Sequence, residues 1–330
     1  MQRREFITLL GSAAAAWPLV ARAQQSQRMR RIGVLMQYTE NDPDSQARRA
    51  GLEADLARLG WMIGRDLAID YRWNNLTVIQ ARAAAAELLA LAPDVILANT
   101  FPSVQALFAA TRTVPVVFTF ITLPAAQGWI ESQAHPGGNM TGFTYLEPPI
   151  AGKWLDLLTE IAPRVTRVAY IFNPPAGAYA GLFYVSIEPS AARFGIETAL
   201  VAVNEPADFE RAIAAHAREP GGGMIINPDS FTSLHRRLII DLAARYHLPA
   251  IYSRRFFTAD GGLASYGVDD NDHFRQVASY LDRILRGEKP ADMPVQQPTK
   301  FELLINKKTA EALALGLPTT LLARADELIE

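Results

Sequence analysis

Short apolar runs alternate with helix-like segments along most of the chain. In the first half we expect strands at 31–36, 67–73, 94–98 and 114–120, separated by helices at 47–59, 80–91 and 103–110. Each expected strand is a short, mostly apolar run, and Leu52, Leu56 and Leu59 repeat at the spacing of one helix face. Strict alternation of strand and helix predicts a parallel sheet that helices cover on both faces.

The same pattern restarts after residue 150. We expect strands at 167–172, 197–203, 224–227 and 250–253, with helices at 153–161, 184–194, 208–217 and 234–246. The glycine-rich stretch 136–142 lies between the two sets and is interpreted as the first crossing of the chain from one unit to the other. The sequence therefore predicts two doubly wound α/β units of similar size.

The last part of the chain adds a strand at 261–266, a helix at 272–285, a strand at 300–305 and a helix at 307–315. Extra elements after two complete units suggest that the chain returns to the first unit and then crosses back. We therefore expect one lobe from 30–143 plus 263–297 and a second lobe from 144–262 plus 298–330. Three connections between two lobes would form a hinge.

The N-terminal stretch has the parts of an export signal. Arg3 and Arg4 precede an apolar run at 6–20, and Ala21-Arg22-Ala23 places small residues at the cleavage positions. The paired arginines resemble a twin-arginine signal, so we expect residues 1–23 to be removed on export. The 330-residue chain contains no cysteine, which excludes a lipid-anchored N-terminal cysteine as well as disulfides and thiol catalysis. We expect a soluble protein in the periplasm with no lipid anchor.

Composition and motifs argue against several functions. The formal net charge is −2 with no basic tract, which argues against a nucleic-acid partner. None of the five histidines stands in a metal-binding or zinc-protease pattern, and the glycines at 221–223 lack the spacing of a dinucleotide loop. We therefore expect no catalytic residues, no cofactor and no metal site.

The ends of the expected strands carry the informative residues. Ligands of open α/β sheets bind outside the carboxyl ends of the strands. There the sequence places hydroxyls, amides, aromatic rings and a few charges. The predicted ligand-binding residues are Tyr38, Thr100, Phe101, Ser103, Thr122, Asn173, Asn227, Asp229, Tyr252 and Arg254.

These residue types suit a small molecule with an apolar face and a charged end. Ser103 could cap a helix whose free N–H groups accept a carboxylate. Arg254 or Arg255 could hold a carboxylate, and Asp229 could accept an ammonium group.

Several contiguous stretches resemble one family. They are PGGNMTGFT at 136–144, GKWLDLLTEIAPRVTRVA at 152–169, and long segments at 238–267 and 280–318. The chain resembles the periplasmic substrate-binding proteins of ABC transporters, of the tryptophan/tyrosine type. The resemblance implies an α/β, type I periplasmic binding protein fold with two Rossmann-like lobes joined by a three-crossing hinge. Many members carry Asp-Pro where this chain has Leu123-Pro124, so that acidic group is missing here.

We expect a monomeric receptor of an ABC importer that delivers its ligand to the transporter's permease subunits. The expected ligand is a small carboxylate: an aromatic or branched amino acid, or an aromatic acid. Two alternative functions would use the same cleft between the two lobes. One is a periplasmic sensor subunit for a membrane kinase or chemoreceptor, and the other, less favoured, is an enzyme.

Overall fold

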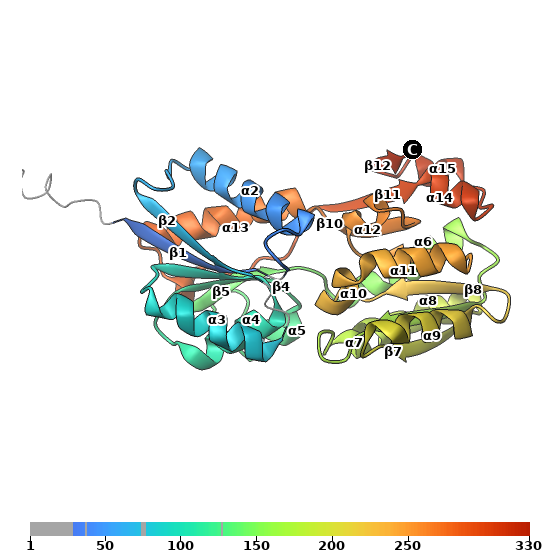
Figure 1. Cartoon of the computed structure of the whole chain (residues 1–330), viewed down its shortest axis with the longest axis horizontal. Coiled ribbons are helices and arrows are strands. Elements are labelled where there is room, and N and C mark those ends of the chain that lie inside the picture. Colours follow the sequence, from blue (N-terminus) through green and yellow to red (C-terminus); the bar gives the residue numbers. More distant parts are fainter. Residues whose placement is uncertain (1–28, 37, 74–76, 127) are drawn as a thin grey trace, which may run out of the picture.

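A computed structural model of the chain describes residues 29–330 except 37, 74–76 and 127. It consists of two lobes side by side, each built around its own sheet with helices on both faces (Figure 1). The predicted α/β architecture is confirmed. The expected export signal at 1–23 lies outside the described residues. Within the described ranges, no helix combines the length and the apolar character needed to cross a lipid bilayer.

The first lobe contains a parallel five-stranded sheet in the order β2-β1-β3-β4-β5. Its strands are β1 (Arg30–Leu35), β2 (Leu67–Arg72), β3 (Val95–Ala98), β4 (Val116–Ile121) and β5 (Met140–Thr144). Its helices are α2 (Pro43–Arg58), α3 (Val78–Ala90), α4 (Phe101–Ala110), α5 (Leu123–Ala126) and α13 (Asp270–Leu285).

Both faces of this sheet are buried, which explains why its strands are continuous apolar runs. Successive side chains of a strand point to opposite faces. Val95 and Leu97 of β3 accordingly pack in the core beneath α2 and α13. Ile96 and Ala98 of the same strand pack in the core beneath α3 and α4.

The second lobe contains a seven-stranded sheet in the order β12-β11-β10-β9-β8-β6-β7, in which only the β10–β11 pair is antiparallel. Its strands are β6 (Arg167–Phe172), β7 (Glu197–Ala202), β8 (Gly222–Ile226), β9 (Ala250–Tyr252), β10 (Ala264–Val268), β11 (Phe301–Asn306) and β12 (Glu327–Ile329). Its helices are α6 (Ile150–Ile161), α7 (Ala180–Val185), α8 (Glu188–Phe194), α9 (Pro206–His216), α10 (Ser230–Leu234), α11 (Arg236–Arg245), α12 (Arg255–Ala259), α14 (Lys307–Ala312) and α15 (Thr319–Leu322).

The chain passes between the lobes three times: after β5, after β10, and between a 3-10 turn at Pro290–Asp292 and β11. Side chains tie these crossings together. The hydroxyl of Tyr145 donates to Asp270 Oδ1 at 2.8 Å, and Lys300 Nζ lies 2.5 Å from Asp269 Oδ2. Three crossings linked in this way have the arrangement of a hinge between two lobes.

The segment 263–268 belongs to the second lobe and not, as expected, to the first. Residues 263–268 were assigned to the first lobe, whereas Ala264–Val268 pairs with β9 and β11 in the second sheet. The second crossing therefore follows Val268. The apolar run looks the same whichever sheet it joins, because its pairing partners are remote in sequence.

Two further elements differ from the expectation. Met140–Thr144 forms a strand of the first sheet, so the glycine-rich stretch enters the sheet before the chain crosses. Gly142 allows this because its φ is +153° and a Cβ there would lie 2.1 Å from the carbonyl oxygen of Phe118. The expected helix at 184–194 is divided into α7 and α8, and Pro189 stands in the first turn of α8, where proline is tolerated.

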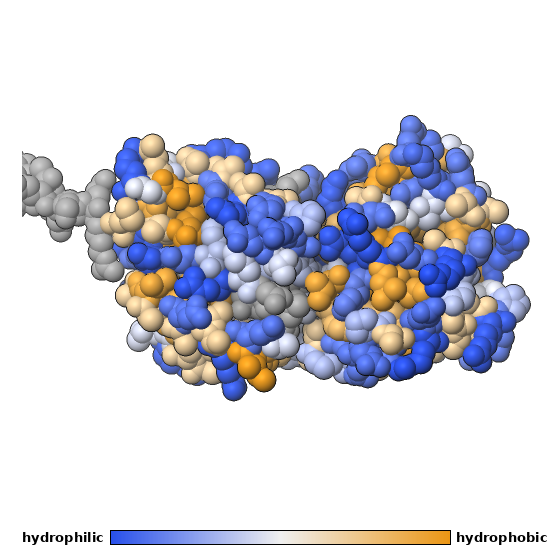
Figure 2. Space-filling view, in the orientation of Figure 1, coloured by the Kyte–Doolittle hydropathy of each residue, from blue (hydrophilic) through white to orange (hydrophobic). Residues whose placement is uncertain are grey.

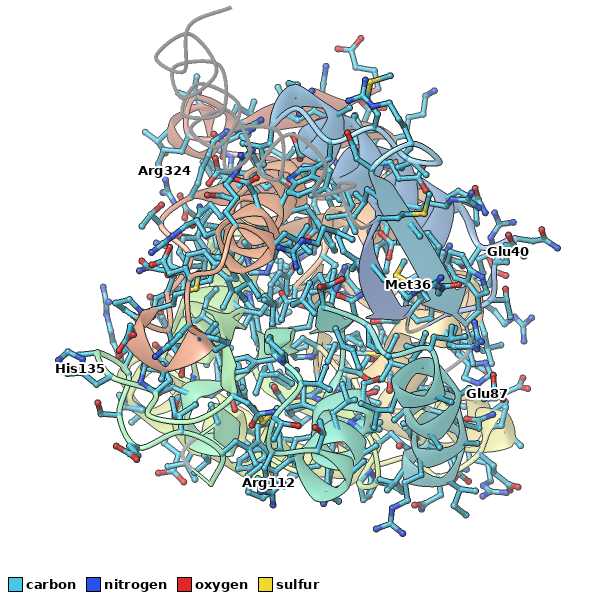
Figure 3. All side chains as sticks on the ribbon, turned by 90° about the vertical axis from the view of Figure 1, so that its left-hand side faces the viewer. Met36, Glu40, Glu87, Arg112, His135 and Arg324 are labelled. Carbon is cyan, nitrogen blue, oxygen red and sulfur yellow. The ribbon has the colours of Figure 1, made fainter. Side chains whose placement is uncertain are left out.

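Polar side chains surround the first lobe when it is viewed end-on (Figure 3). Glu40, Glu87, Arg112 and His135 lie at its rim, exposed, whereas Met36 at the end of β1 is buried inside it. On the face shown in Figure 2, hydrophobic residues form separate patches on both lobes, and hydrophilic residues predominate along the upper boundary between the lobes.

Candidate functional site

Two adjoining pockets lie between the lobes. The first, here called the apolar pocket, encloses about 520 Å³, part of it open to solvent. It is lined by Phe101, Phe120, Ile121, Thr122, Tyr145, Leu146, Ala176, Gly177, Ala178, Tyr179, Ala180, Phe183, Asn227 and Pro228. The second, here called the polar pocket, encloses about 450 Å³ and is lined by Asn99, Thr100, Phe101, Pro102, Phe120, Tyr145, Ala176, Pro228, Asp229, Ser230, Ser233 and Arg254.

The two pockets share Phe101, Phe120, Tyr145, Ala176 and Pro228, so they form one cleft with an apolar half and a polar half. The lining comes from both lobes and largely from the segments that follow β3, β4, β6, β8 and β9. This is the edge of the sheets where ligands of open α/β folds bind.

Aromatic rings wall the apolar half. The ring of Phe101, at the start of α4, lies edge-on to that of Tyr179, with centroids 5.9 Å apart. The first residue belongs to the first lobe and the second to the other lobe, so the lobes touch across the cleft. Phe183 of α7 and Phe120 at the end of β4 complete a surface suited to a flat apolar group.

Phe120 has a strained backbone and two cationic neighbours. Its φ is +59°, which a non-glycine residue rarely adopts, and the β4–β5 register shifts between Phe118 and Ile121. The Arg48 guanidinium lies 4.4 Å from its ring centroid, and the Arg254 guanidinium lies 4.8 Å from it. Such strain concentrates at ligand-binding sites, where the surrounding structure holds it in place.

Arg254 is the cation of the polar half and is only 6% exposed. Its Nη2 lies 3.1 Å from Asp270 Oδ2 and 3.9 Å from Asp44 Oδ2. Among the described residues its Nε–H finds no hydrogen-bond partner. A buried donor of this kind is costly unless an acceptor reaches it.

Asp44 is shared between two arginines, since its Oδ2 also lies 2.6 Å from Arg48 Nη2. The pKa of Asp44 is raised to about 7, chiefly by burial; Arg254 acts against this rise, and the Asp270 carboxylate contributes to it. Near neutral pH this carboxyl group is therefore only partly ionised. Arg48 and Arg254 thus lie with Asp44 and Asp270 in one buried charge cluster, and Arg254 is its member that lines the polar pocket.

A second ion pair joins the lobes beside the cleft. Asp42 Oδ1 caps α2 by accepting from the backbone N–H groups of Asp44 and Ser45. Its Oδ2 lies 3.4 Å from Arg236 Nη1 in the second lobe, and Arg236 also binds Asp260 at 2.9 Å. The pair is largely buried and directly joins the two lobes, so removing one charge would leave the other uncompensated.

Asp229 lines the polar pocket, but its oxygens already have partners. Oδ1 accepts from Thr232 N–H at 2.8 Å, and Oδ2 accepts from Asn227 Nδ2 at 2.9 Å and from Asn173 N–H at 3.1 Å. These bonds tie the ends of β6 and β8 to the start of α10. Burial raises the pKa of Asp229 above its ordinary value.

The structure brings six of the ten predicted ligand-binding residues to the cleft wall: Thr100, Phe101, Thr122, Asn227, Asp229 and Arg254. The other four do not line either pocket: Tyr38, Ser103, Asn173 and Tyr252. Tyr252 stacks on Phe257 in the core of the second lobe, with centroids 4.5 Å apart. The side chain of Asn173 is held by Val203 O at 2.8 Å.

The cap of α4 is Thr100 rather than Ser103. The hydroxyl of Thr100 accepts from the backbone N–H of Ser103 at 3.3 Å, and Ser103 is the third residue of the helix and fully buried. The N-terminus of α4 therefore meets the polar pocket through Thr100, Phe101 and Pro102.

A carboxylate does lie near Leu123-Pro124, where many members of the family carry Asp-Pro. Oε1 of Glu147, from the first crossing, accepts from the backbone N–H of Leu123 at 2.9 Å. Burial raises the pKa of this glutamate. The acidic group thus comes from a segment distant in sequence and hydrogen-bonds to the backbone at the start of α5.

Four aromatic residues of the cleft were not among the predicted ones: Phe120, Tyr145, Tyr179 and Phe183. Tyr145 directly follows β5, which the sequence pattern does not predict as a strand, so the pattern does not place Tyr145 at a strand end. Tyr179 and Phe183 come from the long segment after β6, and their apolar character alone does not distinguish a cleft wall from a core.

A hinged pair of α/β lobes with an aromatic and cationic cleft between them defines the class of two-lobed solute-binding proteins. The sequence model of the family described as ABC transporter substrate binding protein matches residues 32–329. The chain belongs to this family, which confirms the resemblance found in the sequence.

Similar proteins support the same fold. A protein named tyrosine-binding protein from Clostridioides difficile (strain R20291) is 23% identical over 87% of this chain and 82% of its own length. A solved conserved domain protein from Vibrio cholerae is 28% identical and superposes with a TM-score of 0.83 over 91% of this chain and 100% of that one. An ABC domain from Streptococcus pneumonia, solved in complex with L-Trp, is 22% identical with a TM-score of 0.81 over 91% and 99%.

Proposed function

We propose that the protein is the periplasmic receptor of an ABC importer and binds a small carboxylate-bearing molecule between its lobes. The observation that carries the proposal is the placement of Arg254: a buried guanidinium that lines the polar end of an aromatic cleft and whose Nε–H has no hydrogen-bond partner in the described part of the chain. An aromatic or branched amino acid or an aromatic acid would match both halves of the cleft. The relatives named for tyrosine binding and solved with L-Trp favour this ligand class.

The hinge explains how binding would be signalled. A ligand whose apolar body lies between Phe101 and Phe183 and whose carboxylate meets Arg254 would contact both lobes at once. It would therefore bind the closed arrangement more tightly than an open one, and this difference in affinity is what shifts the population. Permease subunits of the transporter would then recognise the closed pair of lobes.

The proposed periplasmic location depends on the family and on the twin-arginine leader at 1–23. Cell fractionation tests it. The full chain should yield a shortened product in the periplasmic fraction, and replacement of Arg3 and Arg4 by lysine should keep it in the cytoplasm. A chain retained in the cytoplasm at full length would contradict this location.

Ligand screening tests the binding function. The chain from residue 24 onward should be stabilised thermally by aromatic or branched amino acids or by aromatic acids, and titration calorimetry should give one site per chain. Neutral sugars and nucleosides should give no shift. Binding of sugars or nucleosides in the absence of carboxylate binding would overturn the proposed ligand class.

A further inference from the structure

One segment of the second lobe supplies much of the wall of the apolar pocket. It comprises residues 176–180 and Phe183, which follow β6 and lead into α7. Except at Tyr179, residues 176–180 are alanine or glycine, so they carry no side chain long enough to cross the cleft. The ring of Phe183 is held within its own lobe, stacked on Trp154 with centroids 6.0 Å apart. Tyr179 is therefore the side chain through which this segment reaches the first lobe.

Tyr179 contacts a ring that belongs to a larger aromatic cluster of the first lobe. Its ring lies edge-on to that of Phe101, with centroids 5.9 Å apart and 68° between the ring planes, a geometry that aromatic pairs prefer. Phe101 in turn packs on Trp129 at 5.5 Å, and Trp129 lies 6.4 Å from Phe108. Neither Trp129 nor Phe108 lines the cleft. Tyr179 thus packs against the core of the first lobe, although it belongs to the second.

The backbone that precedes Tyr179 is fixed to the second lobe. Asn173 Oδ1 accepts from the backbone N–H of Ala176 at 3.0 Å, and the backbone oxygen of Asn173 accepts from Gly177 N–H at 2.7 Å. A Cβ at Gly177 would lie 2.7 Å from Asn227 Nδ2, so the segment lies directly against the residues that follow β8. Because the segment is held in this way, the Tyr179 ring moves with the second lobe and leaves Phe101 when the lobes separate.

We propose that Tyr179 closes the apolar half of the cleft and sets how long a ligand stays bound. Its ring meets Phe101 when the lobes come together, and this contact must break before a ligand enters or leaves. A residue of this kind acts mainly on the dissociation rate, since most differences in affinity within one binding site arise there. The effect on a ligand rests on the proposed function, whereas the effect on the lobes needs no ligand.

A measurement without ligand tests the contact between the lobes. The chain contains no cysteine, so Glu87→Cys and Glu210→Cys place one spin label on each lobe at exposed positions of α3 and α9. Double electron–electron resonance on the chain from residue 24 onward should show longer distances after Tyr179→Ala, because the open arrangement gains population. Tyr179→Phe keeps the ring and should restore the shorter distances.

Phe194→Ala, at an exposed ring of α8, is the matched control and should leave the distances between the lobes as in the wild type. Circular dichroism and the melting temperature confirm that each variant is folded. Distances in Tyr179→Ala equal to those of the wild type would overturn the proposal. A shift of the same size in Phe194→Ala would also overturn it, because removal of any ring from the second lobe would then suffice.

Binding kinetics test the effect on a ligand, with L-tyrosine and phenylacetate as probes and tryptophan fluorescence in a stopped-flow instrument as the signal. We expect Tyr179→Ala to raise the dissociation rate about fivefold and to change the association rate less, since one aromatic contact is lost from the closed state. An unchanged dissociation rate would contradict the proposal and leave the receptor function intact. Binding of neither probe to the wild type would contradict the proposed ligand class, and the spin-label distances would then decide the role of Tyr179.

A double-mutant cycle tests whether Tyr179 acts through Phe101. Both rings line the apolar pocket, so each single alanine variant loses contacts with the ligand as well as the contact between the rings. If the rings act as a pair, Phe101→Ala and Tyr179→Ala together should raise the dissociation rate by clearly less than the product of their separate effects. An increase equal to that product would show that the two rings act independently and would refute closure through this contact.

Discussion

The guanidinium of Arg254 lies 4.8 Å from the ring centroid of Phe120, so a cation of the second lobe rests on an aromatic ring of the first. The same ring is approached by Arg48 at 4.4 Å and by Tyr145, whose ring centroid is 4.5 Å away. Phe120 therefore links the ligand cleft to the contact between the lobes. Changes at this position should affect ligand affinity and lobe closure together.

Phe120→Leu tests this link. Leucine keeps much of the apolar volume but removes the ring on which both arginines rest and which walls the cleft. We expect ligand affinity to fall roughly tenfold, since aromatic and cation–π contacts contribute about 0.5–1.5 kcal/mol each. Titration calorimetry measures the loss. Phe194→Leu, at an exposed ring of α8, is the control and should bind normally. Unchanged affinity in Phe120→Leu would remove Phe120 from the site.

Asp42→Asn should loosen the contact between the lobes. Asparagine can still cap α2 through its side-chain oxygen, but it no longer carries the charge that faces Arg236 at 3.4 Å. We expect a larger radius of gyration by small-angle X-ray scattering without ligand and about threefold weaker ligand binding. The control is Asp260→Asn, which removes the partner of the same arginine within the second lobe. If both variants opened the lobes equally, the pair with Asp42 would not be the cause.

Asp44 should make stability depend on pH. Its pKa is raised from 3.8 to about 7, mainly by burial. Between these values the folded protein keeps a proton that the unfolded chain has lost, so the free energy of unfolding falls as pH rises through this window. Asp44→Asn cannot lose that proton. We expect its melting temperature to fall less between about pH 5 and about pH 8 than that of the wild type.

Glu302, whose pKa is also raised to about 7 by burial, should leave part of this pH dependence in Asp44→Asn. Asp241→Asn, at an exposed position of α11, is the control and should retain the wild-type pH dependence. A pH dependence in Asp44→Asn equal to that of the wild type would show that Asp44 ionises as readily in the folded protein as in the unfolded chain.

Gly267→Ala should destabilise the second lobe severely. A Cβ at Gly267 would lie 1.9 Å from the carbonyl oxygen of Ser253, so β9 and β10 would have to separate. We expect a loss of about 3 kcal/mol or more in the free energy of unfolding, measured by urea denaturation. Gly181 of α7 has open space around its Cβ position, and Gly181→Ala should be neutral or stabilising by about 0.5–1 kcal/mol. Similar effects of the two substitutions would contradict this packing.

The sequence predicted those strands and helices whose pattern of apolar residues depends on burial alone. Strands such as β3 are apolar throughout because both of their faces are covered, and that signal is local. Arg254 and Phe101 could be selected because they follow strands. The two carboxylates that pair with Arg254 could not be predicted, because Asp44 lies on α2 and Asp270 on α13, both far from Arg254 in the sequence. The positive φ of Phe120 has no sequence signal, because phenylalanine is not a residue that favours it.

The order in which the elements of each lobe appear along the chain has a consequence for biogenesis. Helix α13 covers Val34 and Leu97 of the first lobe, yet it follows all of the segments from α6 to β10 of the second lobe. As the ribosome extends the chain, the first lobe is synthesised long before the helix that covers one of its faces. Its apolar surface then remains open to aggregation or to chaperones, and the two lobes must mature together rather than in succession.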